Sequence, residues 1–167
     1  NHLVDNLFGV YLHGAGDSNV QDNVIRGRRD LRMAEAGNGV SIWNAPGARV
    51  IGNIISHGRD GIYVRVSREN HFQDNEFSNL RFAIHYMYTH DSRIVGNTSR
   101  DNHVGWAIMF SEGLEVRDNV SINDRDHGLM LNATNGSEVI GNTVRDGGEK
   151  CAFVYNANGN RIEENWF

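Results

Sequence analysis

Along the whole chain, an apolar residue is repeatedly followed three positions later by asparagine. Short runs of alternating apolar residues recur with the same period. From the second occurrence onward the asparagines are 22 or 23 residues apart. Two such runs per repeat, with no helical spacing, indicate short strands joined by polar turns. A repeat of this length predicts a solenoid. The pairs are Val20/Asn23, Val50/Asn53, Phe72/Asn75, Ile94/Asn97, Val116/Asn119, Val139/Asn142 and Ile162/Asn165.

Strands that recur at a fixed step can each lie on the same strand of the previous turn, about 4.8 Å away. We therefore expect an all-β fold, a parallel β-helix of about seven rungs of 22–23 residues, forming a single segment over residues 1–167. The asparagines are expected to point inward and bond backbone, as buried polar groups must. No capping unit closes either end, which predicts a segment of a longer protein. The expected core column is Leu12, Ile42, Val64, Tyr86, Ile108, Leu131 and Val154.

One repeat departs from the rule, because about eight extra residues lie between Asn23 and Gly39. We expect an inserted loop at 26–38, and insertions in solenoids often form the binding face. The loop carries four arginines that can grip carboxylates through paired hydrogen bonds, so it is a candidate for docking an acidic partner or an anionic glycan. A solvated loop with internal ion pairs is the alternative. The candidate docking residues are Arg26, Arg28, Arg29 and Arg32.

The composition argues against several classes of protein. The net charge of −5 argues against nucleic acid as the main partner. No run of 18 apolar residues is present, so the sequence predicts no membrane-spanning segment. Cys151 is the only cysteine, which excludes an internal disulfide and leaves the redox compartment open.

Outward positions of the second strands bring together an unusual set of side chains. Strand alternation places Met87 beside Met109, with His85 next to them and Met130 one rung further on. Thioether and imidazole ligands favour Cu(I) over harder metals, so these four residues form a candidate copper site. The alternative is an adaptable apolar patch for a partner or a covering loop.

A second column of polar residues precedes these strands. Asp126 and His127 are acid and base candidates, and Arg81 could offset the charge of a substrate. Such residues along one groove suit a polysaccharide lyase, epimerase or hydrolase. Opposite charges on successive rungs also arise as cross-strand pairs at a turn, without any catalytic role.

Several stretches carry a family resemblance that runs the length of the chain. The sequence resembles the NosD family, periplasmic β-helix subunits of the copper-processing ABC transporter that matures nitrous oxide reductase. HYMYT (85–89) and KCAFVYNAN (150–158) are more specific than the general repeat. The stretches are GNGVSIWNAPGARVIGN (37–53), RDGIYV (59–64), LRFAIHYMYTHDS (80–92), WAIMFS (106–111), DRDHGLMLN (124–132) and KCAFVYNANGN (150–160).

The resemblance implies a right-handed β-helix outside the cytoplasmic membrane that receives or hands on Cu(I). It also implies an accessory role rather than an enzyme, with an ATPase, a permease, a copper chaperone and nitrous oxide reductase as partners. No ligand set is carried over from the family, so the choice of copper residues rests on strand alternation alone. A carbohydrate-active β-helix and a scaffold that binds only proteins are the alternative functions.

Overall fold

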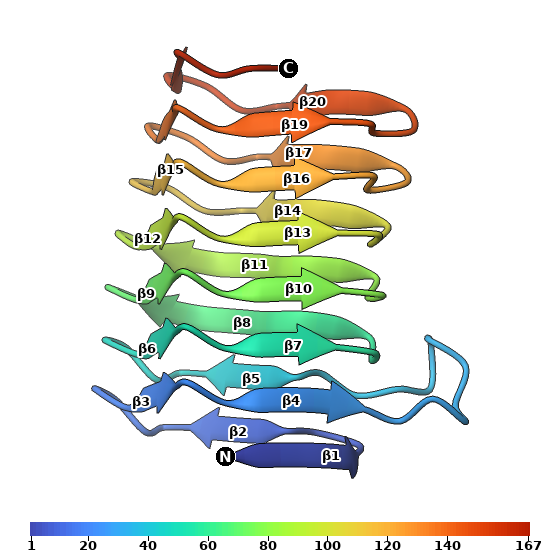
Figure 1. Cartoon of the computed structure of the whole chain (residues 1–167). Helices are drawn as coiled ribbons and strands as arrows, with labels where there is room; N and C mark the ends of the chain where they lie inside the picture. Colours follow the sequence, from blue (N-terminus) through green and yellow to red (C-terminus); the bar gives the residue numbers. More distant parts are fainter.

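Three parallel sheets wind into one right-handed solenoid (Figure 1). The computed structural model describes all 167 residues, and each rung contributes one strand to each sheet in turn. In Figure 1 the nearer strands run to the right, and the fainter strands behind them return to the left as the chain rises from its N-terminus. The parallel β-helix expected from the repeat is confirmed. The structure contains no helix that could cross a lipid bilayer.

We name the sheets A, B and C in the order in which the chain visits them. Sheet A contains β1 (His2–Asn6), β4 (Val24–Gly27), β7 (Ile54–Ser56), β10 (Glu76–Ser78), β13 (Thr98–Arg100), β16 (Val120–Ile122) and β19 (Thr143–Arg145). Sheet B contains β2 (Val10–His13), β5 (Val40–Trp43), β8 (Asp60–Arg68), β11 (Phe82–His90), β14 (Val104–Met109), β17 (His127–Asn132) and β20 (Lys150–Tyr155). Sheet C contains β3 (Asn19–Gln21), β6 (Arg49–Ile51), β9 (His71–Gln73), β12 (Arg93–Val95), β15 (Glu115–Arg117), β18 (Glu138–Ile140) and β21 (Arg161–Glu163).

The predicted core column of sheet B is confirmed in the inner rungs. Its members there are fully buried, whereas in the two outermost strands of the sheet Leu12 is half-buried and Val154 is exposed. Burial of a large aliphatic side chain contributes about 1.5–3 kcal/mol, so this column is a main source of stability. The fully buried members are Ile42, Val64, Tyr86, Ile108 and Leu131.

The prediction of two strands per repeat is wrong, because sheet A supplies a third. From β7 to β19 its strands are only three residues long, and the central residue of each is buried. In β13 and β16 that residue is a buried serine, Ser99 or Ser121. Strands this short with a polar inward residue leave no alternating apolar pattern in the sequence.

The recurrent asparagines form the expected internal ladder. Each side-chain carbonyl accepts the backbone N–H of the asparagine one rung earlier, and each side-chain amide donates to the next asparagine and to nearby carbonyls. Asn97 illustrates the pattern, since its Nδ2 donates to the Oδ1 of Asn119 at 3.0 Å and to the carbonyl of Phe72 at 2.9 Å. The ladder satisfies buried backbone groups at a bend, which is a structural role.

A second internal ladder of polar side chains lies at the turns that lead from sheet A to sheet B, and one of its members is a carboxyl group. Asp124 is fully buried, and its oxygens accept the N–H of Asn102 at 2.9 Å and the hydroxyl of Ser121 at 2.6 Å. Burial raises the pKa of Asp124, although the hydrogen bonds of nearby serines oppose the shift. One rung earlier Asn102 fills the same position, and there the Nδ2 of the asparagine donates to the hydroxyl oxygen of Ser99 at 2.8 Å.

Replacing Asp124 with asparagine should therefore raise the melting temperature at pH 7 by a few degrees, because a buried ionised carboxylate is removed and its hydrogen bonds are kept. A carboxyl whose folded pKa is raised costs stability above that pKa, and this cost disappears once both states are protonated. The gain should vanish below about pH 4. Thermal unfolding of the two proteins across this pH range tests the prediction, and destabilisation at pH 7 would contradict it.

The inserted loop occupies one turn between sheets A and B (Figure 1). It begins two residues later than expected, because Arg26 and Gly27 complete β4. The loop returns against the body of the solenoid, where Ala36 and Gly37 are buried and the carbonyl of Gly37 accepts the N–H of Arg59 at 2.8 Å. Its second half is therefore anchored beside sheet B.

Candidate metal site

The outward face of sheet B carries the four predicted copper ligands in two rows. Met87 lies opposite Met109 in the register of β11 and β14. His85 lies opposite Ala107, and Ala107 lies opposite Met130 in the next strand. The pairing of Met87 with Met109 is therefore as expected from the sequence. Met130 is on the row of His85, two strands away from it.

His85 lies at an outward position of the strand, as expected, but its side chain is buried. Its side chain is only 9% exposed, although it points away from the hydrophobic core. The rings of Tyr63 and Phe82 pack against the imidazole with centroids 5.1 and 5.0 Å away. Strand alternation gave the direction of this side chain but not the neighbours that cover it.

Asp60 fixes the orientation of the imidazole. Its carboxylate oxygen Oδ2 lies 3.0 Å from Nδ1 of His85. A neutral imidazole that donates from Nδ1 to a carboxylate keeps the lone pair of Nε2 free. Histidine ligands of metals are commonly oriented by a carboxylate in this way. The Nε2 atom of His85 is buried and makes no hydrogen bond within the protein.

Arg81 completes this buried group by binding the same carboxylate through two hydrogen bonds. Its Nε and Nη2 donate to Oδ1 and Oδ2 of Asp60 at 2.9 and 2.6 Å. Burial disfavours the charged carboxylate, but the hydrogen bonds from His85 and Arg81 and the positive charge of Arg81 outweigh it, so the pKa of Asp60 lies below its ordinary value. Asp60 is thus an ionised carboxylate with both oxygens occupied.

A cavity of about 340 Å³ opens beside this group. His85 and Met87 line it together, and residues 36–38 of the inserted loop form part of its wall. Tyr63 and Arg59 are also in the lining. The cavity is therefore lined by one histidine, whose Nε2 has no partner, and by one methionine. Met109 and Met130, both half-buried, lie outside this lining.

The polar residues that were considered for catalysis, Arg81, Asp126 and His127, each contact different neighbours. Arg81 is bound to Asp60, and Arg125 reaches Asp126 at 3.4 Å. His127 packs against the ring of Phe153, with centroids 5.2 Å apart. Arg81 precedes β11, whereas His127 belongs to β17, two strands away in sheet B. These residues do not form one constellation of acid, base and cation.

Asp60 is the residue that the sequence did not connect with the site. In the register of sheet B it lies opposite Phe82, which lies opposite Val104. An aspartate that lies opposite apolar residues in the neighbouring strands indicates a buried carboxylate with a polar partner. The structure contains no group of three or more His, Cys, Asp or Glu side chains arranged to hold a metal ion.

Comparison with known proteins supplies independent information. A family model described as "Periplasmic copper-binding protein (NosD)" matches residues 21–167. Proteins named "Probable ABC transporter binding protein NosD" from Stutzerimonas stutzeri and Pseudomonas aeruginosa are 35% and 38% identical, over 96% of this chain. The aligned region spans 40% of each relative's length. The Streptococcus pneumoniae surface protein and adhesin PfbA has the same type of fold, with a TM-score of 0.51 over 99% of this chain and 63% of that one, at 9% identity.

Proposed function

The chain belongs to the NosD family of periplasmic copper-binding proteins, and from this premise we propose that it is a periplasmic accessory module that receives or hands on Cu(I). The copper is cargo for the assembly of the copper centres of nitrous oxide reductase. His85 and Met87 form the centre of the binding site, with Met109 beside them and Met130 further along the face. The observation that carries the proposal is that His85, whose buried Nε2 has no hydrogen-bond partner, lines one cavity together with Met87.

The chemistry of the donors favours a soft monovalent ion. Thioethers are weak ligands for hard cations but bind Cu(I), and a neutral imidazole suits it as well. Both oxygens of Asp60 are already bonded, so this carboxylate orients His85 and does not add a hard ligand. Few protein ligands at a cavity open to solvent also suit a site that must release its ion to another protein.

A competition titration tests this function. Under anaerobic conditions, Cu(I) held by a chromogenic chelator should pass to the protein in a saturable manner, and excess Zn(II) should not displace it. Adding the copper chaperone should change the apparent affinity if the two proteins exchange copper. Failure to compete with the chelator, or equal displacement by Zn(II), would contradict the proposal.

The partners follow from the same premise. The related proteins are named as ABC transporter binding proteins, so association with the permease and ATPase of such a transporter is expected for the longer protein. We assign the inserted loop to docking of the chaperone or the reductase. Arg26 belongs to β4 and Arg28 is paired with Asp30, which leaves Arg29 and Arg32 of the loop with no carboxylate partner.

Replacing Arg28, Arg29 and Arg32 with serine should slow capture of this partner by about tenfold at low salt, because surface charge acts mainly on the association rate. The salt dependence of the rate should become flatter, and the melting temperature should not change. Stopped-flow or surface-based association measurements over a salt series test this prediction. Arg49, Arg65 and Arg68, on other parts of the solenoid, serve as a matched triple serine control. Unchanged rates with every candidate partner would contradict a docking role.

A further inference from the structure

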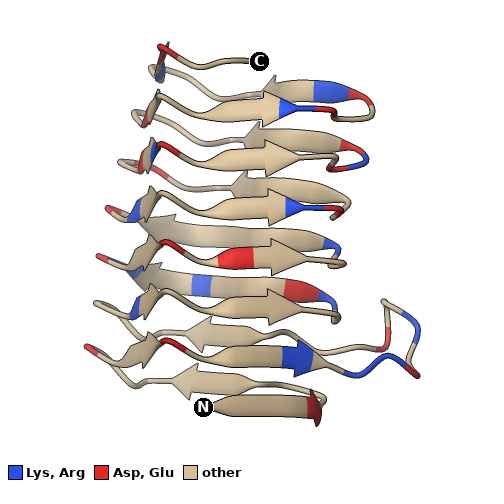
Figure 2. Cartoon of the chain, viewed as in Figure 1, with Lys and Arg blue, Asp and Glu red and all other residues tan.

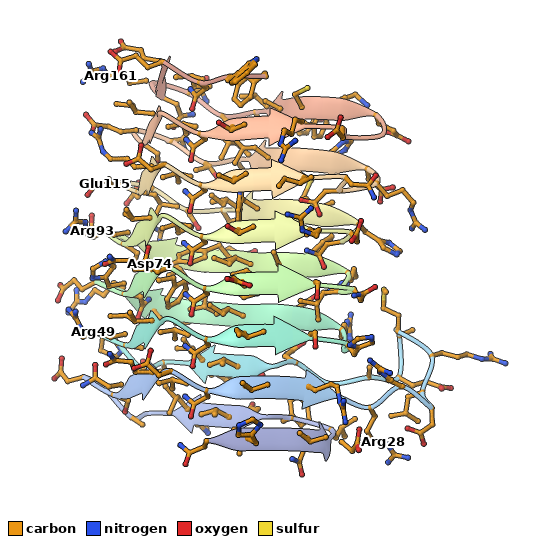
Figure 3. All side chains as sticks on the ribbon, in the orientation of Figure 1. Arg28, Arg49, Asp74, Arg93, Glu115 and Arg161 are labelled. Atoms are coloured by element: carbon orange, nitrogen blue, oxygen red, sulfur yellow. The ribbon has the colours of Figure 1, made fainter.

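A second cavity lies under the inserted loop, separate from the one that His85 lines. Its volume is about 340 Å³, and its wall includes Arg28, Arg29 and Ala36 of the loop and His57 of the solenoid. Figure 2 shows the loop as a projection rich in basic residues, and Figure 3 shows Arg28 on this side of the molecule. The cavity thus combines cationic groups from the loop with a histidine from the next rung.

At both ends of the inserted loop, the backbone packs closely against the solenoid next to this cavity. A Cβ atom on Gly27 would lie 2.0 Å from the carbonyl oxygen of His57, so only glycine permits the two chains to approach there. At the other end of the loop, a Cβ atom on Gly37 would lie 2.1 Å from the carbonyl oxygen of Leu7. Glycines therefore hold both ends of the loop against the body of the protein.

Arginines and side-chain nitrogen atoms without a partner lie close together at this position. The Nε atom of Arg26 and the Nδ1 atom of His57 are buried and make no hydrogen bond within the protein. Burial lowers the pKa of His57, and the charges of Arg29 and Arg26 lower it further. Asp5 approaches Arg26 only to 3.9 Å.

The opposite edge of the solenoid differs from this arrangement. Arg93 and Arg161 lie there with Glu115 (Figure 3). Arg93 pairs with Glu115 at 2.7 Å, and Arg161 pairs with Glu163 at 2.7 Å. Arg93 and Arg161 are therefore each compensated by a carboxylate of the chain itself, whereas Arg29 has no such partner.

We propose that the cavity lined by Arg28, Arg29 and His57 binds an oxyanion, either a free ion such as phosphate or the carboxylate of an acidic side chain of a partner protein. Guanidinium groups match the planar or tetrahedral oxygens of these anions through charge-assisted hydrogen bonds. The bound anion would supply the acceptor that Arg29 lacks within the chain. The site deepens the docking role proposed for the loop, but it does not depend on copper binding.

Binding can be followed through the imidazole NMR signals of His57 while inorganic phosphate or a short aspartate-rich peptide is added in separate experiments. Saturable shifts of these signals are expected for at least one probe, and Arg29→Gln combined with His57→Gln should weaken binding of that probe by about tenfold or more, as judged by calorimetry. A response to phosphate alone indicates a free ion, whereas a response to the peptide alone indicates a partner's carboxylate.

Arg68→Gln is the matched control, because this exposed arginine lies on another corner and approaches only Glu69, at 3.8 Å. Equal weakening by the control would mean general charge attraction and would overturn the proposal. Absence of saturable shifts with both probes would also overturn it. Cu(I) binding measured on the same variants should be unchanged, so failure of this site is distinguishable from failure of the copper site.

Discussion

Replacing Ile108 with aspartate should give no soluble folded protein. Ile108 is fully buried in the central part of the sheet B core column, between Tyr86 and Leu131 of the adjacent strands. A carboxylate there would have no partner, and an unpaired buried charge costs several kcal/mol. This cost is comparable to the whole stability of an ordinary domain. Expression, solubility and circular dichroism of the variant check the result.

Phe110 provides the matched control in the same segment. It lies two residues further along, is 41% exposed and has a positive φ of 50°, a conformation that aspartate tolerates better than most residues. Phe110→Asp should therefore fold. A folded Ile108→Asp protein with a melting temperature close to that of the Phe110 variant would contradict the assigned register of sheet B.

Changing His85, Met87 and Met109 together to alanine should abolish Cu(I) binding. The variant loses the imidazole nitrogen without a partner and the two thioethers that lie opposite each other in β11 and β14. None of the three side chains belongs to the main hydrophobic core, so the solenoid should remain folded. Loss of His85 leaves the ion pair of Asp60 and Arg81 in place. Chelator competition and circular dichroism measure binding and folding separately.

Met33→Ala is the matched control, because Met33 is the only methionine outside this face of sheet B. It lies in the inserted loop and lines other cavities. Its loss should leave the affinity for Cu(I) unchanged. Retention of full copper affinity by the triple variant would show that the ion binds elsewhere.

The repeat made the fold predictable from the sequence. A large apolar residue and an asparagine at fixed offsets recur because each rung needs the same inward pair, and this pattern correctly located Ile108 and Asn97 inside the solenoid. The strands of sheet A escaped detection because their single inward residue need not be apolar, as Ser99 shows. Local sequence cannot distinguish such a strand from a polar turn.

The candidate site was predictable only in part. Alternation along β11 correctly gave the shared face of His85 and Met87 and the pairing of Met87 with Met109. The bond between His85 and Asp60 joins residues 25 positions apart on neighbouring strands, so it depends on register and on side-chain packing together. The cavity also depends on the path of the irregular loop, which no repeat specifies.

X-ray absorption at the copper edge of the Cu(I)-loaded protein tests the assignment of His85 and the methionines most directly. The spectrum should contain both an imidazole nitrogen and thioether sulfur as copper ligands. Replacing Met87 and Met109 with leucine should remove the sulfur contribution while keeping the apolar volume, and replacing His85 with glutamine should remove the imidazole signature. A copper ion surrounded by nitrogen and oxygen alone, or a spectrum unchanged by these substitutions, would contradict the proposed site.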